Sequence, residues 1–298
     1  MKNERKIIRD LASILGLGEC IDYDACPFND KIIVNMDGYA LEYSKYPFLT
    51  LEDWGYRSIA AAVSDVIASG GTPKAVLYSV GVRSGEEAQA IAIGISEAVR
   101  KLGLKVLKSD LNRATRPWID VAVLGVTERP VSRAGAGPGD LVIQAGYLGY
   151  GLVEYLVFKG KIPLHEAWNI VGFARRLPPR IEKVIMRYAT ASSDNSDGWS
   201  ATLWNIAYSS NVSIHLDDFI IDPQVRGLLE KYRVKLETGL TSWEDYNIAF
   251  TVKAEDAVRA LDECKALGVN CWIVGRVGEG PARVEYRGRE LAYGWEWL

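Results

Sequence analysis

Six aspartates occupy positions where a carboxylate is unusual. They lie at the ends of expected helices and strands, in turns flanked by Gly or Ser, or beside a Ser in an apolar helix: Asp24, Asp37, Asp65, Asp110, Asp194 and Asp197. A carboxylate next to apolar segments is costly to desolvate unless a cation or hydrogen bonds compensate it. Several converging carboxylates would suit Mg²⁺, which prefers hard oxygen ligands. Each aspartate alone is also explained as a helix cap or turn residue, so spacing leaves both interpretations open.

The sequence has few residues for histidine- or cysteine-based sites and lacks the common nucleotide-binding motifs. The two histidines, His165 and His215, stand in unrelated surroundings, which disfavours a histidine-based nucleophile or a multi-histidine metal site. The four cysteines show no C-x-x-C spacing, so we expect neither a zinc knuckle nor a disulfide framework. The Gly160-Lys161 pair is followed by Ile162, which excludes a Walker A loop, and no glycine cluster fits a dinucleotide-binding fingerprint.

The composition is that of an ordinary globular protein. Hydrophobic residues make up 48% of the 298 residues and charged residues 24%, and at roughly 150 residues per domain the length predicts about two domains. The formal net charge of −3 offers no basic excess for binding nucleic acid. No apolar run approaches the roughly 18 to 20 residues that span a bilayer, so we expect no membrane association and a cytoplasmic location.

Helices and strands are mixed in the first half of the chain. Thr50 can cap a helix closed by Gly70 and Gly71, and Ser84 with Glu87 forms a capping box for another. The hydrophobic patterns predict helices over 4–14, 51–69 and 84–102, and strands over 31–37, 75–82, 105–108 and 119–127. The segment 130–140 is rich in Gly and Pro, which indicates a junction between two halves.

The second half repeats this mixture after the junction. We expect strands at 141–145, 212–216, 246–253 and 269–277, helices at 151–158, 165–175, 179–189 and 254–267, a helix through Trp204, a polar loop at 191–198 and a hairpin at 287–291. Strands and helices do not alternate strictly one to one. The fold class is therefore predicted as α+β, with domains 1–130 and 131–298.

The acidic positions, taken in order, match one family along nearly the whole chain. The residues that carry the match are 22–26 (Asp-Tyr-Asp-Ala-Cys), 35–37, 60–73 with Ser64 and Asp65, 109–110, 132–140, 194–198 (Asp-Asn-Ser-Asp-Gly) and 243–246. They resemble the thiamine-monophosphate kinase family, within a superfamily that includes aminoimidazole ribonucleotide synthetase, selenophosphate synthetase and a hydrogenase maturation factor.

The resemblance implies a fold and an activity. It implies two α/β domains of the aminoimidazole ribonucleotide synthetase-like type and a homodimer built through the sheet of the N-terminal, ATP- and metal-binding domain. It also implies direct transfer of the γ-phosphoryl group of ATP to thiamine monophosphate, assisted by Mg²⁺. Such a transfer asks the protein mainly to position the reactants and neutralise charge, which carboxylates that hold metal ions can do without histidine.

The resemblance also assigns roles residue by residue. Metal binding falls to Asp24, the stretch Asn35, Met36 and Asp37, and to Asp65, Asp110, Asp194 and Asp197, of which Asp110 and Asp197 are also the catalytic candidates. ATP contacts fall to Ser109, Asp110, Arg133 and Ser196. Contacts with the acceptor substrate fall to Ser44, Glu244, Tyr293 and Trp295.

The sequence departs from the family pattern at four places. It has Tyr23 where the family usually has a second acid, Ala62 where the family has an Asn, Lys108 and Ser109 where the family has two glycines, and Ser44 near an absent His-Phe pair. These departures keep two alternatives open. One is a related ATP-dependent kinase or synthetase for another small acceptor, and the other is a non-catalytic nucleotide-binding paralogue.

Overall fold

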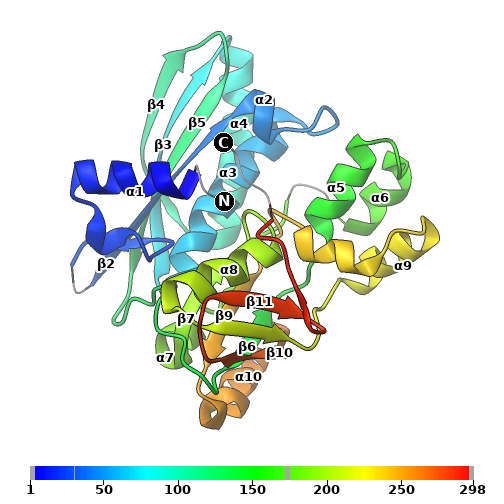
Figure 1. Cartoon of the computed structure of the whole chain (residues 1–298). Coiled ribbons are helices and arrows are strands. Elements are labelled where there is room, and N and C mark those ends of the chain that lie inside the picture. Colours follow the sequence, from blue (N-terminus) through cyan, green and yellow to red (C-terminus); the bar gives the residue numbers. More distant parts are fainter. Residues whose placement is uncertain (1–3, 30, 172–174, 295–298) are drawn as a thin grey trace.

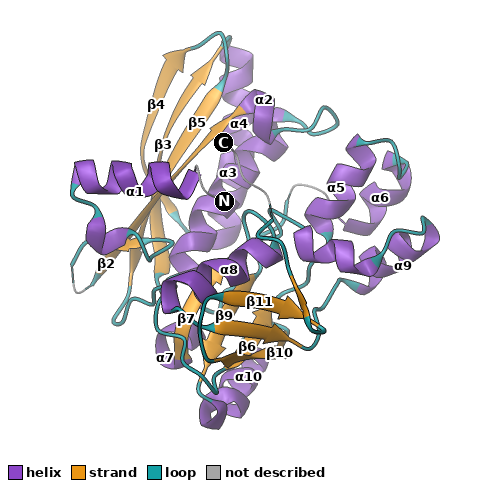
Figure 2. Cartoon of the chain, viewed as in Figure 1, coloured by secondary structure: helices purple, strands orange, loops and turns teal. Residues whose placement is uncertain are grey.

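The chain forms two sheets with helices between and around them (Figures 1 and 2). The computed structural model describes residues 4–29, 31–171 and 175–294. The first sheet has the strand order β1-β2-β5-β3-β4. Its strands are β1 (Cys26–Pro27), β2 (Ile32–Ala40), β3 (Thr72–Val82), β4 (Lys105–Arg113) and β5 (Trp118–Val126). Strand β3 is antiparallel to β5 and parallel to β4.

Two long helices cover one face of the first sheet. The helices of this half are α1 (Glu4–Leu15), the 3₁₀ turn η1 (Gly18–Cys20), α2 (Leu41–Ser44), α3 (Leu51–Ala68) and α4 (Gly85–Leu102). Helix α3 starts at a capping box between Thr50 and Asp53, and α4 starts at the Ser84 cap and ends at Gly103 in the left-handed conformation. The opposite face of the sheet carries exposed side chains such as Met36 of β2.

The second sheet has seven strands in the order β12-β11-β8-β10-β6-β9-β7. They are β6 (Leu141–Ala145), β7 (Ala189–Asp194), β8 (Ser213–Leu216), β9 (Ile248–Val252), β10 (Cys271–Gly278), β11 (Arg283–Tyr286) and β12 (Arg289–Glu290). Around it lie α5 (Tyr150–Phe158), α6 (Leu164–Val171), α7 (Glu182–Tyr188), α8 (Trp199–Ser210), α9 (Pro223–Lys231), η2 (Leu236–Thr241), η3 (Ala254–Asp256) and α10 (Ala257–Ala266).

Helix α3 joins the two halves. It packs on β2, β3 and β5 of the first sheet and also contacts α7, β7 and β9 of the second half. One continuous apolar core accordingly contains Val63 and Val66 of α3, Ile185 of α7 and Phe250 of β9. Side chains on α3 that are not used for packing on the first sheet are therefore presented directly to the second half.

The predicted α+β class with two sheets is confirmed, but several elements differ from the sequence prediction. The segment expected as a polar loop at 191–198 is a loop only after Asp194, because residues 189–194 pair with β9 as β7. Helix α9 was not predicted, and the end of the helix expected at 165–175 lies partly outside the described residues. The expected boundary at 130/131 falls in the irregular segment between β5 and β6.

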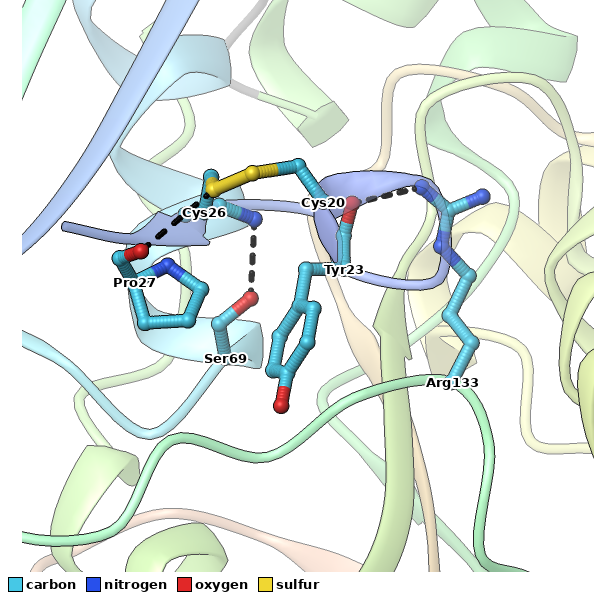
Figure 3. The surroundings of a disulfide bond; sticks show 7 residues. Cys20, Tyr23, Cys26, Pro27, Ser69 and Arg133 are labelled. Carbon is cyan, nitrogen blue, oxygen red and sulfur yellow. Dashed lines mark hydrogen bonds between the residues drawn. A yellow bond between two sulfur atoms is a disulfide. The ribbon is translucent and has the colours of Figure 1, made fainter. Parts of the chain in front are cut away.

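No disulfide framework was expected from the cysteine spacing, but one disulfide is present, because Cys20 and Cys26 are bonded to each other (Figure 3). Their separation of six residues matches no metal-binding spacing, and the turn between them brings the two sulfur atoms together. Cys264 and Cys271 are free thiols. Across the described residues, no helix has both the length and the apolar character required to cross a bilayer.

Candidate active site

Three carboxylates from distant parts of the sequence meet between the two halves. Asp24 lies in the loop before β1, Asp65 near the end of α3, and Asp194 at the end of β7. One oxygen atom from each lies within 4.8 Å of the others. Each aspartate stands at or near the end of its element, which is where the two halves approach each other. The arrangement has the oxygen donors and the size of a site for a divalent cation.

Asp37 joins this group through Asn35. The Asn35 Nδ2 atom donates a hydrogen bond of 2.5 Å to Asp65 Oδ2 and lies 3.5 Å from Asp37 Oδ2. The same nitrogen donates to the Ala62 carbonyl oxygen of α3, so this face of β2 is turned toward α3. We call Asp24, Asp37, Asp65 and Asp194 the carboxylate cluster.

Neighbouring groups hold the carboxylate cluster in place. Arg133 Nε lies 2.8 Å from Asp24 Oδ1, and the backbone N–H of Asp194 donates to Asp24 Oδ2 at 3.1 Å. The Ser193 hydroxyl donates to Asp24 Oδ1 at 3.2 Å, and the Ser64 hydroxyl donates to Asp194 Oδ2 at 2.5 Å. Of the four carboxylates, only Asp24 pairs with a guanidinium among the described residues, which leaves the cluster with more carboxylates than positive charges.

The pKa values of the cluster reflect burial first and the neighbouring negative charges second. Burial raises the pKa of Asp24 and Asp37 above their usual values, although Arg133 opposes the effect on Asp24. Burial and the charges of the other cluster members raise the pKa of Asp65 well above its usual value. Burial and the charge of Asp24 raise the pKa of Asp194 to about 8. A bound divalent cation would favour the ionised carboxylates and so oppose these shifts, and the oxygen donors fit Mg²⁺.

Asp110 lies elsewhere in the described structure. It is exposed on β4 and accepts hydrogen bonds from Asn112 Nδ2 at 2.8 Å and Ser79 Oγ at 3.3 Å. In the strand order β2-β5-β3-β4, three spacings, or about 14 Å, separate β4 from β2. The buried Val80 faces the helices, so its neighbour Ser79 and the adjoining Asp110 face away from them. Within a single chain, Asp110 therefore lies away from the carboxylate cluster.

The other metal and ATP candidates fall into two groups. Met36 is 67% exposed on the face of β2 opposite to Asp37, so its side chain points away from the cluster, and Ser109 is exposed on β4 beside Asp110. Ser196 and Asp197 lie in the loop between β7 and α8 that directly follows Asp194. The Ser196 carbonyl oxygen accepts a hydrogen bond from the backbone N–H of Glu244 at 2.9 Å.

Glu244, a predicted acceptor contact, belongs to a buried network of ion pairs. Its carboxylate pairs with Arg57 of α3, whose Nη1 atom lies 2.9 Å from Glu154 Oε2 of α5. Arg176 Nη1 lies 2.7 Å from the other Glu154 oxygen, and Arg176 Nη2 donates to the Glu244 carbonyl oxygen at 3.0 Å. Arg57 and Asp65 are eight residues apart on α3, which places this network and the carboxylate cluster about 12 Å apart along one helix.

The remaining acceptor candidates have other partners. The Ser44 hydroxyl donates to the Ala40 carbonyl oxygen and accepts from Trp54 Nε1, both at 2.8 Å, so it is used in local structure. The Tyr293 hydroxyl donates to Asn205 Oδ1 at 2.8 Å. Trp295 lies outside the described residues.

Sequence reasoning missed the basic half of the buried network. The segment 175–180 has the Arg- and Pro-rich composition of a solvated turn, but the Arg176 side chain is only 8% exposed and pairs with Glu154. A signal was present, because Glu154 is the one charged residue in the apolar helix 150–158 and therefore needs a buried partner.

Comparison with known proteins gives consistent relatives. Residues 22–127 match the family described as AIR synthase related protein, N-terminal domain. The thiamine-monophosphate kinase of Pyrococcus horikoshii is 32% identical over 286 residues, covering 91% of this chain and 88% of the relative. That of Aquifex aeolicus is 33% identical over 76% of this chain and 74% of the relative.

Solved structures agree with these relatives. AaThiL complexed with AMPPCP and TMP superposes with a TM-score of 0.88 at 26% identity, covering 99% of this chain and 97% of that one. Thiamine monophosphate kinase from Aquifex aeolicus gives 0.82 at 26% identity, covering 95% and 96%. The hydrogenase maturation protein HypE gives 0.72 at 16% identity, covering 91% of each chain, which shows a shared fold.

Proposed function

The chain belongs to the thiamine-monophosphate kinase family, and from that premise we propose that it transfers the γ-phosphoryl group of ATP to thiamine monophosphate. The bond between the γ-phosphorus of ATP and the oxygen that bridges its β- and γ-phosphates breaks. A bond forms between that phosphorus and a phosphate oxygen of thiamine monophosphate. The products are ADP and thiamine diphosphate.

The observation that carries this proposal is the carboxylate cluster between the two halves. Asp24, Asp37, Asp65 and Asp194 would hold Mg²⁺, which neutralises charge on the phosphates of ATP when bound. Arg133 fixes the orientation of Asp24 and adds a positive charge beside the site. These residues therefore supply the positioning and charge compensation that phosphoryl transfer requires.

The acceptor needs little help from the protein in losing a proton. A phosphate oxygen of thiamine monophosphate is already ionised at neutral pH, so no strong general base is required. His215 is accordingly not needed as a base. It lies on β8 of the second sheet, where its Nδ1 atom is 3.0 Å from Glu285 Oε2 of β11. Glu244, Tyr293 and Trp295 remain our proposed acceptor contacts, and Ser196 remains a proposed ATP contact.

The exposed face of the first sheet supports a homodimer. Hydrophobic side chains on the face turned away from α3 and α4 are solvent-exposed, with Met36 67% exposed and Val126 42%. Exposed apolar surface of this kind is typical of a protein interface. A dimer formed through this face would bury these residues and turn Asp110 of each chain toward its partner, where it could act as the family pattern implies.

The test is formation of ADP and thiamine diphosphate from ATP, Mg²⁺ and thiamine monophosphate, scored beside thiamine and other small acceptors. Asp194→Asn, which removes one cluster charge, is expected to lower kcat/KM about 100-fold or more. The matched control is Asp262→Asn, because Asp262 is exposed on α10. Equal activity of the two variants, or no turnover of thiamine monophosphate by the unaltered protein, would contradict the proposal.

Asp110→Asn and Asp197→Asn extend the same assay to the predicted catalytic residues. A loss for Asp110→Asn that depends on protein concentration would connect Asp110 to the dimer, since the exposed residue has no cluster contact within its own chain.

A further inference from the structure

The loop that carries Asp24 is closed by a covalent bond. The disulfide joins Cys20, the last residue of η1, to Cys26, the first residue of β1, with the Cα atoms 5.1 Å apart (Figure 3). The loop of residues 20–26 therefore forms a ring, and Asp24 is inside it. Both cysteines are half-buried, which leaves the bond within reach of a small dithiol.

The two ends of this loop are anchored very differently. On its C-terminal side, the backbone N–H of Ala25 donates to Ser69 Oγ at 2.9 Å, and Cys26 pairs with Val34 of β2. On its N-terminal side, the Cys20 backbone N–H bonds only locally, to the Leu17 carbonyl oxygen at 3.0 Å. Of the described side chains before Cys20, that of Ala12 alone is buried. Among the described contacts, the disulfide is thus the tie that joins Cys20 directly to the strand β1 of the sheet.

The loop presents three acceptors to one arginine. The Asp22 carbonyl oxygen accepts from the backbone N–H of Arg133 at 2.7 Å, and the Tyr23 carbonyl oxygen accepts from Arg133 Nη2 at 2.9 Å. The third is Asp24 Oδ1, 2.8 Å from Arg133 Nε. The Asp22 carboxylate also accepts from Ser209 Oγ of α8 at 2.8 Å. The position of Asp24 relative to the second half therefore depends on the whole loop keeping its shape.

From this geometry we infer that the Cys20–Cys26 disulfide is a positioning element for Asp24, and that opening it weakens binding of Mg²⁺ by the carboxylate cluster. The inference rests on the metal role proposed above for Asp24. Mg²⁺ requires nearly ideal octahedral geometry with metal–oxygen distances of about 2.0–2.1 Å, so a ligand that is not held in position lowers the affinity for Mg²⁺. Neither Cys20 nor Cys26 touches the cation or the reacting atoms in this scheme.

The opening reaction is thiol–disulfide exchange with a dithiol. A thiolate of the dithiol attacks one sulfur of the pair and the Cys20–Cys26 bond breaks, giving a mixed disulfide. The second thiol of the reagent then displaces the protein sulfur. The reagent ends as its own cyclic disulfide, and its two electrons and two protons pass to Cys20 and Cys26, which become thiols.

The test measures Mn²⁺ binding by electron paramagnetic resonance without nucleotide, using Mn²⁺ as the probe for the divalent site. The unaltered full-length protein is compared before and after dithiothreitol and again after reoxidation, beside Cys20→Ser/Cys26→Ser. We expect the dissociation constant to rise about tenfold on reduction, to return on reoxidation, and to be high and insensitive to dithiol in the double variant. The matched control Cys271→Ala should keep the full response, because Cys271 lies on β10.

A second readout separates positioning from general damage. In the kinase assay, reduction should raise the apparent KM for Mg²⁺ about tenfold and change kcat at saturating Mg²⁺ much less. Equal Mn²⁺ affinity of the oxidised and reduced protein would overturn the inference, and so would four free thiols in the air-oxidised protein. A protein without kinase activity whose Mn²⁺ affinity still follows the disulfide would refute the proposed function and leave this inference standing.

Discussion

Replacement of Arg57 by methionine should destabilise the protein strongly. Arg57→Met keeps the apolar stem and removes a guanidinium that is 3% exposed and faces two carboxylates, those of Glu154 and Glu244. Removal of one partner from a buried ion pair costs about 3–5 kcal/mol, because the remaining charge is left without compensation. Glu154 keeps Arg176 at 2.7 Å, so the uncompensated group is mainly Glu244. We therefore expect a loss near the lower limit, about 3 kcal/mol of unfolding free energy.

Urea unfolding followed by tryptophan fluorescence measures this loss. The control is Arg187→Met, which removes an ion pair with Glu263 of similar length, 2.7 Å, but with an arginine side chain that is 59% exposed. Exposed pairs contribute about 0–1 kcal/mol. Adding Glu244→Gln to Arg57→Met removes the stranded carboxylate and should recover part of the loss.

Two outcomes would contradict the expected effect of burying an unpaired carboxylate. If Arg57→Met and Arg187→Met lower the unfolding free energy equally, the interior site does not penalise an unpaired carboxylate. If Glu244→Gln fails to recover any stability in the Arg57→Met background, the unpaired carboxylate of Glu244 is not the cause of the destabilisation.

Three further predictions concern other parts of the molecule. The metal-free protein should lose stability as the pH rises from about 4 to about 8, because the folded chain keeps on Asp194, with a pKa of about 8, a proton that the unfolded chain has already lost. Thermal melting checks this expectation. Millimolar Mg²⁺ should reduce the loss, and a rise in stability with pH would contradict it. Gly94→Ala should lower the unfolding free energy by at least about 2 kcal/mol, since its Cβ would overlap the Glu52 carbonyl oxygen where α4 crosses α3. The control Gly85→Ala meets nothing within 4 Å and should leave stability unchanged. Equal urea midpoints of the two variants would contradict this expectation. Reduction of the seven-residue disulfide ring should lower the unfolding free energy by about 2 kcal/mol through loop entropy, measured by urea unfolding with and without dithiol; an unchanged midpoint would contradict this.

The sequence was most informative where one residue type had to do something unusual. Asp65 is a charge inside an apolar helix, and Asp194 follows a run of small residues, so both could be singled out before the structure placed them within reach of Asp24. Local capping signals similarly predicted the start of α3 at Thr50 and of α4 at Ser84.

Features that depend on long-range pairing could not be predicted in this way. Ser192 and Ser193 are typical loop residues, yet they are buried in β7 because β9, more than fifty residues later, supplies their backbone partners. Arg176 has the composition of a surface turn around it, and only the position of Glu154 explains its burial. The disulfide likewise needs a turn geometry that cysteine spacing alone does not encode.

The place of β6 in the second sheet determines when the chain can finish folding during synthesis. Strand β6 is the first strand of its half to be made, but it lies between β9 and β10, which follow roughly a hundred residues or more later. The first sheet, in contrast, is complete once β5 ends at Val126. At about 5–20 residues per second, some ten to thirty seconds of translation follow. During that interval the apolar side of α3 that later meets β7 and β9 has no cover, so a fragment that ends after the first sheet should self-associate when it is expressed alone.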